Sequence, residues 1–380
     1  MEIILIANEK GGTAKTTTCL ALANCLTALG FKTLVADTDP SGNLSAAALP
    51  DFPKHVLYDV FRGKCSVQDA IVTTEIADVL PTLKDLGDTR EQSGTGRFVL
   101  RERKTLTSIF SDMESEKDGE NLLSYLLRFS ELEKTYDFVI MDSAPSDSVL
   151  ITNAIVAADS IIVPCEPASA SANGLYMFIR SVQNAINFRQ KLAPQLPEGT
   201  YDPNLNLDGL VLTRYSDDWK TRREQIENIL EMAKNLDMNV YSTKFRNSSA
   251  FEESMNECRP ILDYVNRGFG ASDAMNFTLE FLAKRGLAPR VDFPGVFKDE
   301  KGNFIFRKNG SKCFTYVVEN DVAYVEKQNF RLEYLKNKNW AEQIGKTIFF
   351  SMENLNEYLN QAGIPWLFES VPIPEEQEEP

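Results

Sequence analysis

One stretch of this chain decides its fold: Asn8-Glu9-Lys10-Gly11-Gly12-Thr13-Ala14-Lys15-Thr16-Thr17. The apolar residues 3–7 before it predict a buried strand, and residues 18–26 after it predict a helix. A strand, a glycine turn, a Lys-Thr pair and a helix cradle the phosphates of a nucleotide, because backbone N–H groups and the positive helix end meet the anionic oxygens there. We therefore predict a nucleotide-binding loop made of Lys10, Gly11, Gly12, Thr13, Ala14, Lys15, Thr16 and Thr17.

The loop departs from the usual phosphate-loop spacing, because Glu9 and Ala14 stand where its two glycines would be. A second lysine, Lys10, lies at the start of the loop instead. In loops of this kind, Lys15 would reach the β- and γ-phosphates and the Thr16 hydroxyl would ligate Mg²⁺. Alanine is small but poorly suited to a positive φ, so the backbone at position 14 is where this loop differs most from a glycine loop.

Carboxylates follow two further apolar runs. Asp37 and Asp39 end the run that begins at residue 33, and such carboxylates near a γ-phosphate can orient or polarise the attacking water. The sequence Asp37-Thr38-Asp39-Pro40-Ser41-Gly42-Asn43 would also suit an ordinary turn, and the pattern alone leaves both interpretations open. Residues 138–141 are apolar and are followed by Asp142, a Walker B arrangement that would place this carboxylate beside the metal.

Apolar runs alternate with helix-like stretches along residues 1–290. This alternation predicts an α/β fold, with a mostly parallel twisted sheet flanked by helices on both faces, and places ligands at the carboxyl ends of the strands. Residues 84–120 are polar and charged, and we interpret them as surface loops around a helix. The predicted strands are residues 2–7, 33–37, 77–81, 137–142, 160–164, 208–213 and 239–243.

Composition narrows the functional classes. The chain has 380 residues, 43% of them apolar, which suits roughly two domains with a sizeable core. A net charge of −15 disfavours a constitutive nucleic-acid coat but allows a local basic face. The six cysteines include no Cys-x2-Cys pair and His55 is the single histidine, so we expect neither a zinc site nor a cysteine-ligated cluster. With no signal peptide and no apolar run of about 18 residues, we expect a cytoplasmic protein without a membrane span.

Over residues 1–288 the chain resembles the ParA-type partition ATPases, which belong to the deviant Walker A (ParA/MinD) branch of the P-loop NTPases. The loop Lys10-Gly11-Gly12-x-x-Lys15-Thr16-Thr17 matches that family's phosphate loop. Residues 37–43 resemble its Asp-x-Asp-Pro-Gln-Gly-Asn switch, and residues 142–146 resemble its Asp-x-Pro-Pro-Ser switch. Residues 259–264 resemble its Lys-Pro-Ile-Leu-Asp-Tyr stretch. Four matches in chain order argue against chance.

The resemblance implies a mechanism. ATP would be sandwiched between two subunits, with Lys15 binding phosphates in its own subunit and Lys10 reaching those of the partner. Thr16, Asp39 and Asp142 would surround Mg²⁺, and Asp39 would polarise the attacking water. The ATP-bound homodimer would bind DNA without sequence preference and associate with the nucleoid. A ParB-like partner would stimulate weak hydrolysis and release the dimer, which would segregate plasmid or chromosomal DNA.

Two further sets of residues follow from the resemblance. Lys244-Phe245-Arg246-Asn247 stands where the family often has Ile-Pro-Arg-Asn, so Phe245 and Arg246 are candidate adenine contacts, although loop packing would also explain them. Ser41 and Ala144 replace a Gln and a Pro within the two switches, which bears on the rate of hydrolysis. The family's DNA-binding patch would comprise Lys220, Arg222, Arg223, Arg267, Lys284 and Arg285, each of which could equally be an ordinary solvated side chain.

We predict four segments: a ParA-like ATPase domain at 1–288, a linker at 289–296, a small α+β domain at 297–371 and an acidic disordered tail at 372–380. The small domain would contain strands near 304–306, 314–318 and 322–325 and a helix at 355–359. It could dock a cargo adaptor, cover the ATPase or support dimerisation.

Other functions remain as alternatives. One is an ATPase that positions a protein cargo. A MinD-like regulator at a membrane would need a basic amphipathic C-terminal helix, whereas residues 374–380 are acidic, so no membrane partner is expected. A nitrogenase-iron-protein-like carrier would need paired cysteines. A binding module that does not hydrolyse ATP is disfavoured by the intact set Lys15, Thr16, Asp39 and Asp142.

Overall fold

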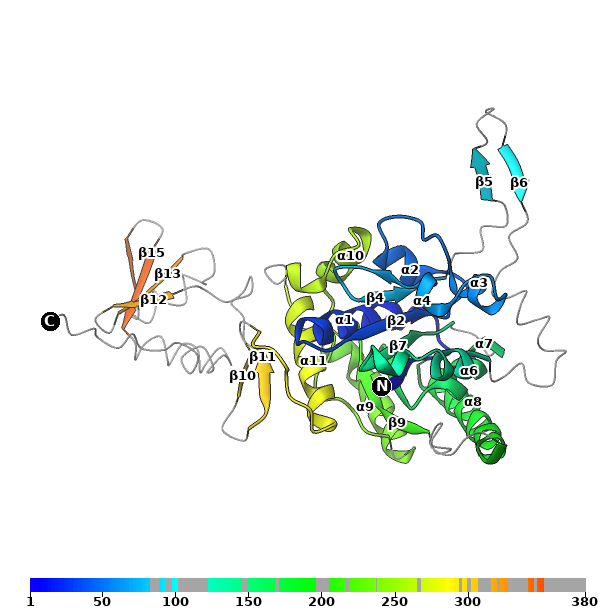
Figure 1. Cartoon of the computed structure of the whole chain (residues 1–380). Coiled ribbons are helices and arrows are strands. Elements are labelled where there is room, and N and C mark those ends of the chain that lie inside the picture. The colour runs from blue at the N-terminus through cyan, green and yellow to red at the C-terminus, as the bar shows by residue number, and fades with distance from the viewer. Residues whose placement is uncertain are drawn as a thin grey trace.

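The structure is a computed structural model of the whole chain (Figure 1). It describes residues 1–82, 89–92, 98–101, 122–144, 149–167, 171–195, 205–215, 219–236, 238–264, 268–293, 296–298, 302–306, 316–319, 322–326, 341–344 and 347–351.

A seven-stranded sheet forms the centre, in the order β3-β4-β2-β7-β1-β8-β9. Only the short β3 runs antiparallel to its neighbour β4, which confirms the predicted, mostly parallel α/β sheet. The strands are β1 (Glu2–Ile6), β2 (Thr33–Asp37), β3 (Val72–Thr73), β4 (Asp78–Leu80), β7 (Phe138–Asp142), β8 (Ser160–Cys165) and β9 (Asn206–Leu212).

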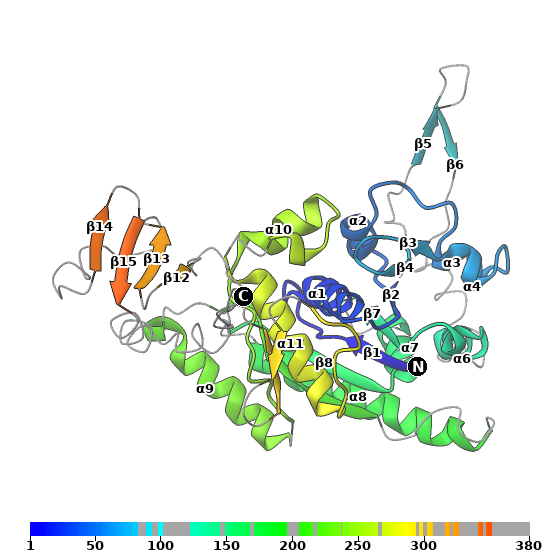
Figure 2. The ribbon, with the colours of Figure 1, turned by 60° about the vertical axis from the view of Figure 1, so that its left-hand side comes forward.

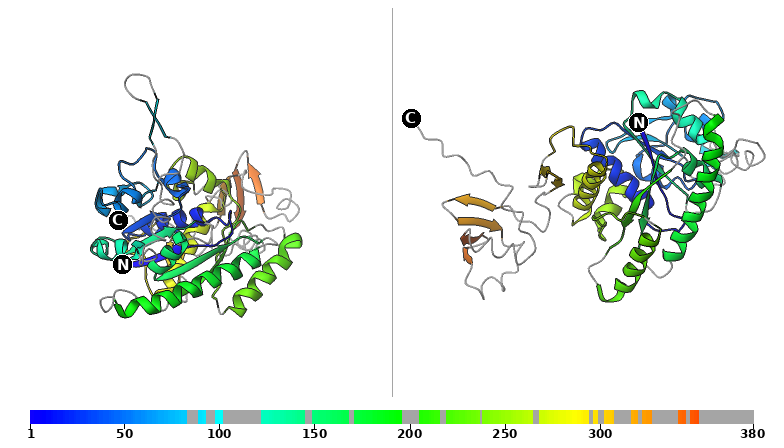
Figure 3. Two further views of the ribbon diagram at one scale, coloured as in Figure 1. Left: turned by 90° about the vertical axis from the view of Figure 1, so that its right-hand side faces the viewer. Right: turned by 90° about the horizontal axis from the view of Figure 1, so that it is seen from below.

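Helices cover both faces of the sheet, because the apolar side chains of each central strand alternate between two cores. The helices α6, α7, α8 and α9 lie on one face and α1, α2 and α11 on the other (Figures 2 and 3). In β1, Ile3 and Leu5 belong to the first core, and Ile4 and Ile6 belong to the second. The helices are α1 (Lys15–Ala28), α2 (Asn43–Ala48), α3 (Leu57–Phe61), α4 (Val67–Ala70), α6 (Leu122–Phe129), α7 (Val149–Ala157), α8 (Ser171–Leu192), α9 (Trp219–Asn235), α10 (Ser249–Asn256) and α11 (Gly270–Lys284), with 3₁₀ turns η2 (Leu132–Lys134), η3 (Ala193–Gln195) and η4 (Ile261–Tyr264).

The parallel register brings the functional carboxyl ends to one edge. Asp142, the last residue of β7, pairs with Ile6 of β1 on one side and with Asp37 of β2 on the other. The segments that follow β1, β2 and β7 therefore begin side by side at the same edge of the sheet.

The predicted strand at 239–243 is wrong as a continuous strand. Val240 forms a single bridge with Leu210 of β9. Beyond it, the N–H groups of Ser242 and Thr243 donate to the Glu280 carboxylate of α11, at 2.6 and 2.9 Å. The segment therefore bonds to β9 only at separate points. The Tyr241 N–H donates to the Leu210 carbonyl and the Phe245 N–H donates to the Leu212 carbonyl, while a side chain of α11 takes the backbone donors between them.

The charged stretch at 84–120 also differs from the prediction. It contains two antiparallel strands, β5 (Thr89–Gln92) and β6 (Phe98–Arg101), which project from the core (Figure 1). The aromatic and apolar run Phe98-Val99-Leu100 favours a strand. The prediction of a loop gave too little weight to this local preference. The helix expected in this stretch lies outside the described residues.

After α11 come a hairpin, β10 (Val296–Lys298) with β11 (Phe304–Phe306), and a four-stranded antiparallel sheet in the order β12-β13-β15-β14. Its strands are β12 (Tyr316–Glu319), β13 (Val322–Glu326), β14 (Ala341–Ile344) and β15 (Thr347–Ser351). Phe306 is buried in the core formed by α11, and its N–H donates to Asn276 Oδ1 at 3.0 Å. The hairpin thus packs on the preceding unit. The helix expected at 355–359 and the tail at 372–380 fall outside the described residues, and the four predicted segments stay a prediction.

Of the helices that the structure describes, none combines the length and the apolar character needed to cross a bilayer.

Candidate nucleotide-binding site

The predicted phosphate loop connects β1 to α1 at the carboxyl edge of the sheet (Figure 2). Gly12 and Ala14 both have left-handed backbones, with φ of 77° and 64°. Ala14 is the N-cap of α1, and its side chain makes no capping hydrogen bond to the first turn. The N-terminal N–H groups of α1 therefore face the loop, which is the arrangement that binds anions. An alanine at this φ costs about 1–2 kcal/mol relative to glycine.

Lys15 lies inside the loop rather than in solvent. Its side chain is buried, and Nζ donates to the carbonyl oxygens of Asn8 and Lys10 at 3.1 and 3.4 Å. Burial lowers the pKa of Lys15, while the nearby carboxylates of Asp142 and Asp39 oppose this shift. The ammonium group is thus placed among the loop carbonyls, where the phosphates of a nucleotide would replace them as partners.

Thr16 and Asp142 lie in direct contact. Thr16 Oγ1 donates to Asp142 Oδ2 at 2.6 Å, and Asp142 is 0% exposed. Burial raises the pKa of Asp142 to about 7, against the opposing effects of the Thr16 hydrogen bond and of Lys15. A buried carboxylate whose charge is this costly suits a cation, and Mg²⁺ commonly uses one or two carboxylates together with phosphate oxygens. The pair Thr16–Asp142 therefore fits Mg²⁺ held jointly by protein and nucleotide.

A metal site made by the protein alone is not found within the described part of the chain, where no group of three or more His, Cys, Asp or Glu side chains converges. The Mg²⁺ ligands would instead come from one hydroxyl, the carboxylates at the sheet edge and the nucleotide.

Asp39 follows β2 at the same edge and is 9% exposed. Its Oδ1 accepts the Ser41 N–H at 2.8 Å, and its carbonyl accepts the Gly42 N–H at 2.9 Å, so the residue closes a tight turn. Its charge acts on both Lys15 and Asp142. The structure thus shows a turn that carries a carboxylate next to the loop, and the role of this turn as a switch stays a prediction.

Lys10, at the start of the loop, is held from two sides. Its N–H donates to Asn8 Oδ1 at 3.0 Å, and Asn8 Nδ2 donates to the carbonyl of Pro164 in β8 at 2.9 Å. Gly174 of α8 lies against it, since a Cβ built there would be 3.4 Å from Lys10 Cβ. The lysine backbone is therefore fixed by β8 and α8.

Two residues after β9 also reach the loop, and the sequence patterns did not identify them. Thr213 Oγ1 donates to the carbonyl of Thr13 at 3.0 Å. Arg214, whose φ is 48°, has Nη1 3.9 Å from the position of a Cβ on Gly12 and 3.7 Å from Glu166. Their signal was positional, because they follow a predicted strand at the ligand-binding edge.

The candidate adenine contacts, Phe245 and Arg246, lie beside the segment that follows β9, where the Tyr215 N–H donates to the Phe245 carbonyl at 2.9 Å. Phe245 is 3% exposed and packs against Phe251 and Phe277, with ring centroids 5.7 and 5.1 Å apart. Arg246 Nε donates to Asp273 at 3.0 Å, and its guanidinium lies 3.5 Å from the centroid of the Phe269 ring. Core packing accounts for the Phe245 side chain, and the ion pair with Asp273 accounts for that of the partly exposed Arg246. An adenine contact by either stays a prediction.

The candidate DNA-binding residues do not form one open patch among the described residues. Arg285 pairs with Glu2 at 2.6 Å and with Asp208 at 3.0 Å, and Lys284 donates to the Asp208 carbonyl at 3.0 Å. Both cations thus have partners within the ATPase fold. Lys220, Arg222 and Arg223 belong to α9, where their side chains are not described, and Arg267 lies outside the described residues.

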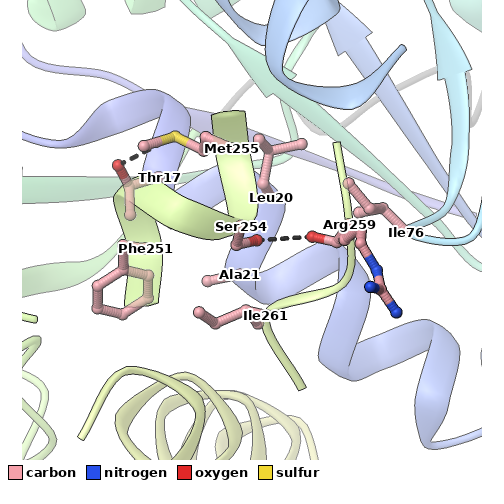
Figure 4. A pocket seen from close by; sticks show the side chains of 9 residues that line it. All are labelled: Thr17, Leu20, Ala21, Ile76, Phe251, Ser254, Met255, Arg259 and Ile261. Atoms are coloured by element: carbon pink, nitrogen blue, oxygen red, sulfur yellow. Dashed lines mark hydrogen bonds between the residues drawn. The ribbon is translucent and has the colours of Figure 1, made fainter. Parts of the chain in front are cut away.

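Residues 259–264, the fourth matching stretch, form the turn around η4 that packs α10 onto α1. Ser254 Oγ donates to the Arg259 carbonyl at 2.6 Å, and the Leu262 N–H donates to Asn24 Oδ1 of α1 at 3.3 Å. A small, mainly apolar pocket remains between these elements (Figure 4). At its rim, Thr17 Oγ1 contacts Met255 Sδ at 3.7 Å, so α10 touches the first turn of α1.

Comparisons with known proteins agree with this geometry. Residues 1–194 match a family model described as an AAA domain. The chromosome partitioning protein ParA of Caulobacter vibrioides is 28% identical over 289 residues, covering 75% of this chain and 95% of that protein. The sporulation initiation inhibitor protein Soj of Bacillus subtilis is 26% identical over 287 residues, covering 74% and 98%.

Two solved structures share the fold. The ATP complex of a McdA variant from Cyanothece aligns with a TM-score of 0.57 and 18% identity, covering 77% of this chain and 99% of that one. The cobyrinic acid a,c-diamide synthase of Mycobacterium smegmatis with bound ADP and magnesium aligns with a TM-score of 0.54 and 23% identity, covering 77% and 100%.

Proposed function

Since the chain belongs to the AAA-domain family and is a ParA-type ATPase, we propose that it works as a Mg²⁺-dependent switch that partitions DNA. ATP would join two copies into a sandwich dimer that binds DNA without sequence preference, and a ParB-like partner would stimulate hydrolysis and release the dimer. The observation that carries the proposal is the convergence of Lys15, Thr16 and Asp142, with Thr16 Oγ1 2.6 Å from Asp142 Oδ2.

Each residue of the site would have one task. Lys15 binds the β- and γ-phosphates, exchanging its two carbonyl partners for them. Thr16 and Asp142, with Asp39 nearby, hold Mg²⁺, which when bound neutralises negative charge that develops on the phosphates. Asp39 orients the attacking water. Lys10 reaches the phosphates of the partner copy, so its charge counts only in the dimer.

Binding to nonspecific duplex DNA tests the partition role. We would compare ATP-Mg²⁺ with ADP-Mg²⁺ across a salt series, because neutralised phosphates make affinity fall steeply with salt. Binding that needs ATP and weakens with salt would support partition. In cells, the ATP form would then lie on the nucleoid.

A second candidate function is the positioning of a protein cargo by the same dimer. It is favoured by the internal ion pairs of Lys284 and Arg285 and by the net charge of −15. ATP-dependent dimers that bind no DNA in either nucleotide state would select this function. The predicted domain at 297–371 would then be the first segment to test for cargo binding.

A further inference from the structure

Asp37, two residues before Asp39, has its own set of partners. It ends β2 and is 0% exposed. Its Oδ2 accepts both the N–H and the hydroxyl of Ser45, at 2.8 and 2.6 Å, and its Oδ1 accepts the Asp39 N–H at 3.2 Å. Both oxygens of the Asp37 carboxylate therefore accept from residues 39–45 of its own segment. The neighbouring Asp142 instead accepts the hydroxyl of Thr16, which follows the phosphate loop.

The bond to the Ser45 N–H is one that a helix normally receives from its own N-cap. Gly42 is the N-cap of α2, with φ of 62°, and it has no side chain to accept from the first turn. Ser45 is the third residue of α2, where a capping oxygen is usually bound. Asp37 supplies that oxygen from the end of β2, so a strand residue caps the helix that follows the Asp39 turn.

Ser45 carries the connection further. Its Oγ donates to Asp37 Oδ2 at 2.6 Å and accepts the Thr82 N–H at 2.8 Å, just beyond β4. Three neighbouring segments, the ends of β2 and β4 and the start of α2, thus meet at one hydroxyl and one carboxylate. Removal of the Ser45 hydroxyl would break its bonds to Asp37 and Thr82 and loosen one end of the 37–45 segment. It would remove no contact of the phosphate loop.

We propose that Asp37 is a positioning residue: by capping α2 through Ser45 it fixes the turn that carries Asp39, and it does not itself ligate Mg²⁺. The inference rests on the proposed ATPase function. Asp37 holds the two ends of the turn, since Oδ1 binds the Asp39 N–H and Oδ2 binds Ser45. Asp39 then accepts from Ser41 and Gly42 within that closed segment.

The test compares Ser45→Ala and Ser45→Thr in the full chain, with hydrolysis measured against ATP and Mg²⁺ concentration. Ser45→Ala should lower kcat about tenfold, the lower end of the loss expected when a partner that orients a site residue is removed. KM for ATP and the half-saturating Mg²⁺ concentration should stay within about twofold. Ser45→Thr keeps the hydroxyl and should restore most of kcat. Asp37→Asn should change kcat in the same direction as Ser45→Ala.

Ser66→Ala is the matched control, because Ser66 Oγ accepts the Asp69 N–H at 3.1 Å and caps α4 away from the loop. It should leave kcat unchanged. A kcat of Ser45→Ala equal to that of the wild type would overturn the inference. So would a tenfold rise in the half-saturating Mg²⁺ concentration of Asp37→Asn at unchanged kcat, which is the signature of a lost metal ligand.

Hydrogen exchange of residues 38–48 in the nucleotide-free protein separates this inference from the proposed function. Asp37→Asn and Ser45→Ala should speed exchange there, whereas Lys15→Ala should not. Faster exchange in the two variants, together with a wild-type protein that hydrolyses no ATP, would refute the proposed function and keep the capping role. Unchanged exchange would refute the capping role even if ATP is hydrolysed normally.

Discussion

At the residue scale, the ammonium group of Lys15 is already held beside the position that phosphates would occupy. Its hydrogen bonds to Asn8 and Lys10 and its buried surroundings make the charge dependent on an anionic partner. Lys15→Ala should weaken ATP binding at least about 100-fold, since hydrogen bonds to a charged group are worth about 1.5–3 kcal/mol each. Titration calorimetry measures this, and Lys64→Ala, an exposed lysine paired with Asp59, serves as control. Retained tight binding would remove Lys15 from the phosphate site.

Ala14 holds a backbone conformation that glycine adopts at lower cost. With φ of 64°, the residue carries left-handed strain of about 1–2 kcal/mol. Ala14→Gly relieves it but gives the unfolded chain more freedom, so the net gain should be about 0.5–1 kcal/mol in the free energy of unfolding. Urea denaturation checks the value. Ala23→Gly, inside α1, should instead destabilise, and a loss in both variants would contradict the strain at Ala14.

The buried carboxylates make stability depend on pH in the metal-free, nucleotide-free protein. Burial and the neighbouring Asp142 raise the pKa of Asp37 from 3.8 to about 8, and burial raises that of Asp142 to about 7. Between the ordinary pKa of 3.8 and these raised values, the folded state binds more protons than the unfolded state. The free energy of unfolding therefore falls as pH rises. Denaturation from pH about 5 to about 8 in EDTA should show this fall, and Asp142→Asn should flatten it. Equal slopes in the two proteins would contradict the assignment.

At the element scale, α11 is joined to β1 by a partly buried ion-pair network. Arg285 is 12% exposed and bridges Glu2 and Asp208, while the Tyr241 hydroxyl donates to Asp208 at 2.7 Å. Arg285→Ala should lower the free energy of unfolding by about 3 kcal/mol, because the buried Asp208 and the partly buried Glu2 both lose their guanidinium partner. Arg259→Ala, whose partner Asp263 is exposed, should cost under about 1 kcal/mol. Weaker DNA binding by Arg285→Ala at unchanged stability would return this residue to the DNA surface.

The elements themselves were predictable where local pattern and burial agree. The central strands are apolar on both faces, and the phosphate-loop residues are contiguous, so both could be recognised from the sequence. The strand at 239–243 was wrong because Glu280, distant in sequence, competes for its backbone N–H groups. The contacts of Thr213 and Arg214 with the loop could not be predicted, because they depend on the order of the strands in the sheet. The cap of α2 by Asp37 could not be predicted either, because no local pattern shows where α2 begins. Lys284 and Arg285 were candidates for DNA binding because they form a basic pair in the sequence, but their partners come from the distant strands β1 and β9.

At the scale of the whole molecule, the proposed dimer depends on Lys10, which the loop, β8 and α8 hold at the edge of the site. Because this charge would meet phosphates only across the interface, Lys10→Ala should leave ATP affinity of the monomer nearly unchanged. The ATP-dependent dimer should weaken at least about 30-fold, which corresponds to about 2 kcal/mol for a desolvated charge contact. Sedimentation velocity with ATP-Mg²⁺ and with ADP-Mg²⁺ measures this. Lys134→Ala, an exposed lysine paired with Glu131 in the turn before β7, is the control and should dimerise as the wild type does. An unchanged dimer in Lys10→Ala would refute the cross-subunit contact, and a matching loss of ATP affinity would place Lys10 in its own subunit's site instead.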